Sequence, residues 1–332
     1  MRHKKFLLFC IIFMIFAIFQ ASSLIIKLGS LAPKGSPWEL ALNRLQAEWA
    51  RISNGSVTLR LYSGGTVGSE SDMLRKMRIG QLNAAGLTGP GLSDRFPGIF
   101  SIYIPRLAHN NEEYAYLMER MIPILNEEFE ENGFKTLFWM HTGWVYLFSR
   151  NRVVYPNDLR PQKMWVGEGD PEIMEAWRRM GCTPVPFSLE DVVIQFQTRG
   201  VDAMVSSPLW VLSLDLYDVA DNMNSLKWAP FPGAIAIDTR IWNRIDAGLR
   251  VQLEEAAQDI AESMKDDWFE IEDDAIDTME RYGLTINNVP QDYHDDWTDF
   301  INTGFLYVLE NYYDMQYYNM AIQILEEYRR QH

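Results

Sequence analysis

The sequence is poor in the residues on which several kinds of function depend. Of its 332 residues only 2 are cysteine and 5 are histidine, and 30 Lys+Arg face 45 Asp+Glu, for a net charge of −15. This shortage of basic side chains argues against binding to nucleic acid, because phosphate backbones are held by lysine and arginine. It equally disfavours docking on anionic lipid.

Motifs for catalysis are missing as well. Cys10 lies inside an N-terminal apolar segment, so Cys182 stands alone in the remainder and no internal disulfide is available there. The sequence contains no His-Glu-x-x-His motif, no Gly-x-Ser-x-Gly elbow and no Walker lysine. We therefore expect a protein that is not an enzyme and that carries no metal and no cofactor.

The N-terminus reads as a targeting segment. Arg2, Lys4 and Lys5 precede an unbroken apolar run of 14 residues at positions 6–19, and Ala21 and Ser23 supply the small residues of a cleavage site. Fourteen residues are too few to span a bilayer comfortably, so residues 1–23 are predicted to be a signal peptide for export to the periplasm. An uncleaved N-terminal membrane anchor is the alternative.

The following residues alternate between strand and helix patterns. A β-like stretch at 25–31 precedes a helix that starts at Ser36, Pro37 and Glu39, which form a capping box with proline in the first turn. A strand at 57–62 and a helix at 70–79 come next. Strands at 134–140, 145–149, 164–166 and 201–205, with helices at 171–180 and 188–197, repeat the pattern. Such alternation predicts βαβ units and a parallel sheet.

Apolar residues recur at helical spacing from about 247 to 282, which predicts one helix roughly 50 Å long. A helix of that length is longer than one lobe of a two-lobed protein should be wide, so we expect it to run along both. The acidic stretch at 266–277 is interpreted as its solvated face.

Several segments, in their order and spacing, resemble the TRAP-transporter substrate-binding proteins of the DctP type. The resemblance covers nearly all of the chain after the leader, and no single motif decides it. It rests on residues 28–38 (LGSLAPKGSPW), 62–70 (YSGGTVGSE), 156–160 (PNDLR), 180–186 (MGCTPVP) and 196–203 (FQTRGVDA).

The resemblance implies a two-lobed α/β periplasmic binding protein fold with crossing strands and a long shared hinge helix. It places lobe 1 at 24–146 plus 231–265 and lobe 2 at 147–230 plus 266–332. The implied function is the extracytoplasmic receptor of a TRAP importer, which traps a small solute between the lobes by hinge closure and delivers it to membrane subunits. The alternative is a periplasmic interaction component that docks a partner such as a tetratricopeptide-repeat protein, for which the aromatic segment at 307–318 is a candidate surface.

The sequence departs from the family where relatives clamp a carboxylate. Trp165 and Val145 align with positions that usually carry arginine, whose fork suits carboxylates. Burying a carboxylate without a charged partner costs several kcal/mol, so we expect an uncharged or hydrophobic solute. The positions that align with the family's pocket are Leu31, Glu70, Leu87, Thr88, Val145, Trp165, Gly167, Phe187, Ser206, Ser207 and Trp210.

Overall fold

The computed structural model describes residues 23–93, 95–168, 171–188, 191–264 and 267–332, so positions 1–22 of the predicted signal peptide lie outside the described residues. The chain forms two compact units, each assembled from separate stretches of sequence. Unit 1 comprises Met1–Ala85 and Ile237–Ile260, and unit 2 comprises Gly86–Ala236 and Ala261–His332. The chain therefore passes from one unit to the other three times.

The predicted lobes also require three passages, but their boundaries differ from those of the units. We expect residues 86–146 in lobe 1, whereas they belong to unit 2. The helix α5 (Asn111–Glu131) packs against the strand β4 (Phe134–Ser149), and the end of β4 pairs with residues 203–206 of the same unit. A lobe consists of residues that move together when a solute binds, while a compact unit is defined by its internal packing. The predicted lobes therefore stay a prediction.

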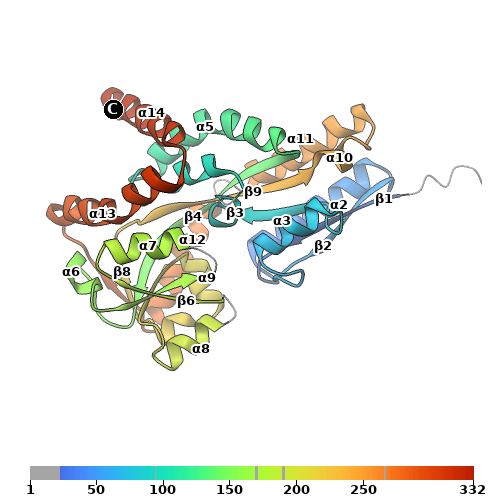
Figure 1. Cartoon of the computed structure of the whole chain (residues 1–332). Coiled ribbons are helices and arrows are strands. Elements are labelled where there is room, and N and C mark those ends of the chain that lie inside the picture. The colour runs from blue at the N-terminus through green and yellow to red at the C-terminus, as the bar shows by residue number, and fades with distance from the viewer. Residues whose placement is uncertain (1–22, 94, 169–170, 189–190, 265–266) are drawn as a thin grey trace, which may run out of the picture. The chain divides into compact units, whose positions relative to one another are not determined.

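Unit 1 is built on two parallel strands, each followed by a helix (Figure 1). β1 pairs with β2 in parallel, with Leu24 opposite Val57. The first helix begins where the sequence predicts, since the Ser36 hydroxyl accepts a hydrogen bond from the Glu39 N–H at 3.3 Å. The elements of unit 1 are β1 (Leu24–Ser30), α2 (Pro37–Ile52), β2 (Val57–Tyr62), α3 (Glu70–Arg78), the start of β3 (Ala84–Thr88), the end of β9 (Ala229–Asp238), α10 (Thr239–Trp242) and most of α11 (Ala247–Ser263).

A tryptophan of α2 joins the early and late segments of unit 1. Trp49 is fully buried, and its indole Nε1 donates a hydrogen bond to the Leu253 carbonyl oxygen of α11 at 3.0 Å. Its ring lies 5.8 Å from that of Trp242, centroid to centroid. Burial of such large side chains contributes a few kcal/mol each, so this contact stabilises the return of the chain to unit 1.

The sheet of unit 2 follows the hydrogen-bonded order β3-β9-β4-β7-β5-β6, and β8 and β10 extend it from β4. β4 runs antiparallel to β7, whereas β5 runs parallel to both β6 and β7. The sequence predicts two strands at 134–140 and 145–149, but β4 is continuous through Gly143. The other strands are β5 (Lys163–Gly167), β6 (Thr183–Phe187), β7 (Ala203–Ser206), β8 (Asn222–Asn224) and β10 (Thr285–Asn287).

Helices of unit 2 pack on this sheet and on one another (Figure 1). The C-terminal pair α13 and α14 packs together, and α14 also packs against α5. The aromatic segment at 307–318 therefore belongs to a packed helix pair. The remaining helices of unit 2 are α4 (Gly89–Ser93), η1 (Pro97–Ile102), α6 (Pro156–Leu159), α7 (Pro171–Arg179), α8 (Val192–Gln197), α9 (Pro208–Ser213), η3 (Leu216–Asp218), α12 (Asp267–Arg281), η4 (Gln291–Tyr293), α13 (His294–Tyr312) and α14 (Met315–Gln331).

The prediction of a single helix at 247–282 is wrong, because two helices occupy this segment. α11 ends at Ser263, Met264 lies in a turn, and α12 starts at Asp267. The apolar spacing continues on both sides of this break, so periodicity could not reveal it. The acidic stretch is also not wholly solvated, because Glu272 is 7% exposed. Among the described helices none is long and apolar enough to cross a membrane.

Candidate functional site

Three predicted site residues occupy equivalent places in unit 2. Gly167, Phe187 and Ser206 are the last residues of the strands β5, β6 and β7, which run parallel to one another. Thr88 is likewise the last residue of β3. In open α/β sheets ligands bind beyond the carboxyl ends of such strands. The sheet therefore places Gly167, Phe187 and Ser206 at one edge, where a solute site is expected.

Two tryptophans stand beside this edge. The rings of Trp165, on β5, and Trp210, on α9, lie nearly parallel, with 9° between their planes and 6.2 Å between their centroids. The Trp165 Nε1 donates a hydrogen bond to the Phe187 carbonyl oxygen at 3.3 Å, which fixes the orientation of its indole. Both tryptophans are only half-buried. The arrangement leaves aromatic surface for a flat or ring-shaped solute.

The two serines have different surroundings. The Ser207 hydroxyl caps α9 by accepting the Trp210 N–H at 3.4 Å, so its first role is to place Trp210. Ser206 is 8% exposed and lies opposite Tyr146 in the β4–β7 register. Val145, the neighbour of Tyr146, is also 8% exposed, and its carbonyl oxygen accepts the Trp228 N–H at 3.0 Å. Ser206 and Val145 both lie in unit 2, and their side chains are almost completely buried.

Leu87 belongs to β3 and is 2% exposed, so its side chain is part of the apolar interior. Thr88 is half-buried at the end of the same strand. That Leu87 and Thr88 contact solute stays a prediction.

In unit 1 the predicted residues also follow the carboxyl ends of parallel strands. Leu31 comes directly after β1, and a Cβ placed on Gly65, after β2, would lie 3.4 Å from its Cδ2. Glu70 is the first residue of α3, where the helix dipole favours a carboxylate. Leu31 and Glu70 therefore lie at the same edge of the β1–β2 pair. That Leu31 and Glu70 contact the same solute as the residues of unit 2 stays a prediction.

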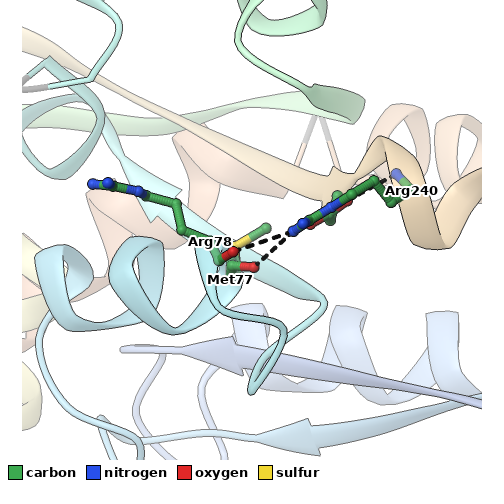
Figure 2. Close-up of polar contacts among 4 residues, drawn as sticks. Met77, Arg78 and Arg240 are labelled. Atoms are coloured by element: carbon green, nitrogen blue, oxygen red, sulfur yellow. Dashed lines mark hydrogen bonds and ion pairs between the residues drawn. The ribbon is translucent and has the colours of Figure 1, made fainter.

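The helix that carries Glu70 is held at its other end by an arginine (Figure 2). The Arg240 Nη2 donates to the carbonyl oxygens of Met77 and Arg78 at 3.4 and 3.3 Å. The same guanidinium donates to both carboxylate oxygens of Asp238, the last residue of β9. Although burial opposes it, these hydrogen bonds lower the pKa of Asp238. The last turn of α3 is thus joined to the end of β9.

Sequence reasoning missed one carboxylate at this edge. Glu39 was assigned to a capping box, but its carboxylate accepts hydrogen bonds from the Ser63 hydroxyl and from the Gly35 N–H. The bond from Ser63 is the main reason that the pKa of Glu39 is lowered, with the bond from Gly35 next. Glu39 therefore ties the segment after β1 to the segment after β2. A capping motif at helical spacing could not reveal this longer-range contact.

The remaining candidate chemistry is weak. Cys182 is buried, and burial raises the pKa of its thiol to about 11, so the thiolate needed for nucleophilic reactivity is scarce at neutral pH. Across the described residues no group of three or more His, Cys, Asp or Glu side chains is placed to hold a metal ion. The surfaces that remain can bind a solute by stacking and hydrogen bonding.

Comparisons with known proteins found a matching family and similar proteins. The family described as DctP, bacterial extracellular solute-binding protein, family 7, matches residues 28–306. A solute-binding protein of Roseobacter denitrificans is 22% identical over 217 residues, which is 62% of this chain and 64% of that protein.

Solved structures resemble the whole fold. A TRAP periplasmic solute-binding protein from Roseobacter denitrificans with bound β-D-glucuronate matches with a TM-score of 0.82 at 18% identity, covering 91% of this chain and 98% of that one. One from Haemophilus influenzae with bound L-gulonate gives a TM-score of 0.82 at 19% identity, covering 91% and 99%. These likenesses assign the two-lobed α/β fold of periplasmic binding proteins.

The same structures correct the expected solute. Glucuronate and gulonate are charged and rich in hydroxyl groups, so the solutes found on this fold count against a hydrophobic one. The interaction component that docks a tetratricopeptide-repeat protein is not supported either, since these similar proteins are described as solute-binding proteins.

Proposed function

The chain belongs to family 7 of the bacterial extracellular solute-binding proteins, the DctP family, and from that membership we propose which kind of solute it holds. Proteins of this family are receptors rather than enzymes. As a TRAP periplasmic solute receptor, the protein binds a small molecule and works with TRAP membrane subunits. The open question is the chemistry of that small molecule.

We propose that the solute is a small ring compound with hydroxyl groups, and that its ring lies against the indoles of Trp165 and Trp210. The observation that carries the proposal is the nearly parallel, half-buried pair of rings. Sugar rings present C–H groups that pack well on aromatic faces, while their hydroxyl groups bond to polar atoms around them. Backbone groups at the ends of β5, β6 and β7 are suited to the second task.

We further propose that binding does not depend on a carboxylate. By the resemblance, Trp165 and Val145 align with two positions at which the family usually carries arginine. A hydrogen bond to a charged group contributes about 1.5–3 kcal/mol, or roughly 10–150-fold in affinity. A receptor without those guanidinium groups gains no such increment from an acidic solute.

A matched pair of solutes tests both parts. D-Glucuronate and D-glucose differ in one group, a carboxylate against a hydroxymethyl group, and each is titrated into the protein by calorimetry. The proposal expects the two affinities to agree within about threefold, because no arginine at 145 or 165 favours the acid. A preference for glucuronate above about 30-fold would contradict it, as would tight binding of an acyclic dicarboxylate with no binding of ring compounds.

A further inference from the structure

A buried carboxylate contacts the strand β4 within unit 2. Glu272 of α12 is 7% exposed, and its Oε2 accepts a hydrogen bond from the Trp144 N–H of β4. Its Oε1 accepts a second one from the Tyr146 hydroxyl at 2.9 Å. Both donors flank Val145, which the sequence analysis predicts to align with a ligand arginine of the family.

The backbone of β4 is shaped for this contact. Gly143 has φ +92°, a conformation that side-chain-bearing residues rarely adopt. A Cβ at this position would also collide with Glu272 Oε2. Glycine at this position therefore leaves room for the carboxylate to accept the Trp144 N–H.

The same contact links other elements of unit 2 that carry predicted site residues. Tyr146 lies opposite Ser206 in the β4–β7 register, so the residue bonded to Glu272 is paired with the last residue of β7. α12 itself packs against β4 and against α9, the helix that carries Trp210 (Figure 1). Glu272 is therefore bonded directly to β4 and is linked to β7 through Tyr146, and its helix packs against α9. Each of these three elements carries a predicted site residue.

Burying a carboxylate at this position costs free energy. Burial of a charge is unfavourable unless hydrogen bonds compensate it, and an apolar residue would fill the space at lower cost. Burial raises the pKa of Glu272, against the hydrogen bonds from Trp144 and Tyr146 that lower it. The other charged groups that face it are Lys227, which also lies 5.2 Å from the Trp144 ring centroid, and Asp273 of its own helix.

We propose that Glu272 is a positioning residue of the solute site, which holds β4, the end of β7 and α9 in the arrangement that binds solute. The proposal rests on the proposed function for the location of the site. The protein binds solute in proportion to the fraction of molecules that hold this arrangement, so loss of the contact weakens the apparent affinity.

Hydrogen exchange of the solute-free protein tests the structural part without any ligand. In the Glu272→Ala variant we expect at least tenfold faster amide exchange both at 143–149 and at 203–213. Glu272→Gln should restore most of the protection, since its amide oxygen accepts the Trp144 N–H and its NH₂ group donates to the Tyr146 oxygen. Faster exchange at 143–149 alone would overturn the proposal, because Glu272 would then stabilise only the part of β4 that it contacts. If the alanine variant fails to fold, Tyr146→Phe removes one of the two bonds and carries the same test.

Titration with D-glucuronate and D-glucose tests the functional part. We expect Glu272→Ala to weaken binding at least tenfold and Glu272→Gln to change it less than about threefold at pH 7.5. An alanine variant that binds as tightly as the wild type would overturn the proposal, as would a glutamine variant that binds as weakly as the alanine variant.

Glu128 supplies the matched control. It is 8% exposed in unit 2, its pKa is raised by burial, and its Oε1 accepts the Gly98 N–H at 3.2 Å. It lies on α5, and its hydrogen bond reaches η1 and not β4, β7 or α9. Glu128→Ala should lower stability while leaving affinity unchanged, and an equal loss of affinity would show that general destabilisation explains both variants. If neither solute binds the wild type, the proposed ring solute fails, and the exchange experiment still decides the role of Glu272.

Discussion

The indole of Trp165 lies nearly parallel to that of Trp210, and its own ring nitrogen is bonded to the Phe187 carbonyl oxygen. Each residue comes from a different element, so β5, β6 and the short helix α9 all contribute to one aromatic surface. A second stacked pair, Trp177 and Trp228, is buried in the core of the same unit. The contrast between a half-buried and a fully buried pair allows the two roles of tryptophan to be separated by mutation.

Trp165→Ala should weaken solute binding at least tenfold, about 1.4 kcal/mol, because the ring of the solute loses its stacking surface. Its melting temperature should change little, since the side chain is only half-buried. Trp177→Ala should instead lower the melting temperature strongly by leaving a cavity. Calorimetry and thermal unfolding of both variants measure the two effects. A Trp165 variant that unfolds early and binds normally would refute the assignment.

Trp165→Arg should convert the receptor towards acidic solutes. The new guanidinium offers two parallel hydrogen bonds to a carboxylate, so the ratio of glucuronate to glucose affinity should rise at least tenfold. Asn288→Arg adds the same charge at an exposed position and should leave that ratio unchanged. An unchanged ratio in the Trp165 variant would mean that position 165 does not face the solute.

Gly143→Ala should destabilise the protein more than Gly80→Ala. Both glycines have positive φ, +92° and +74°, so each alanine costs about 1–2 kcal/mol in backbone strain. A Cβ at Gly80 meets nothing within 4 Å, whereas one at Gly143 collides with the Glu272 carboxylate. Urea unfolding should show at least about 1 kcal/mol more loss for Gly143→Ala. Equal losses would argue against the close contact.

Glu113→Gln should destabilise unit 2 in a pH-dependent way. Arg329 of α14 donates to both carboxylate oxygens of Glu113 at 2.8 Å, and it also bonds the Leu107 carbonyl oxygen. Burial alone would raise the pKa of Glu113, but the bonds from Arg329 and from the His109 N–H lower it overall. Since Arg329 is 37% exposed, we expect a loss of only about 1–2 kcal/mol at pH 7.

The sign of the pH effect follows from the lowered pKa. The folded state holds the proton of Glu113 less tightly than the unfolded state, so the bridge stabilises the protein fully above the ordinary pKa of about 4.5. The difference between wild type and Glu113→Gln should therefore shrink as the pH falls below that value. A difference that stays constant from pH 7 to pH 3 would contradict the ion pair.

The sequence predicted the parts of the fold that local chemistry determines. Ser36 and Pro37 marked the start of α2, and the strand ends at Gly167 and Phe187 fell among residues already singled out. Periodicity did not reveal the turn at Met264, since apolar spacing continues through it. It also hid Glu272, a charged residue on the buried face that carries Ala275 and Met279.

For the site, the sequence allowed a prediction of which residues take part but not of the contacts that hold them in place. The pocket residues named from the resemblance stay a prediction, although the structure places Gly167, Phe187 and Ser206 at the ends of parallel strands. The contacts of Glu39 with Ser63, and of Glu272 with Trp144, join residues far apart in sequence and have no local signature. Such contacts arise from tertiary packing, which cannot be inferred from local patterns in a single sequence.

The solute that accompanies the protein through native purification tests the central claim most directly. The protein and its Trp165→Ala variant are purified without added solute, unfolded, and the released small molecules are identified by mass spectrometry. The account predicts a hydroxyl-bearing ring compound in stoichiometric amount from the wild type and much less of it from the variant. An acyclic dicarboxylate released equally by both proteins would contradict it.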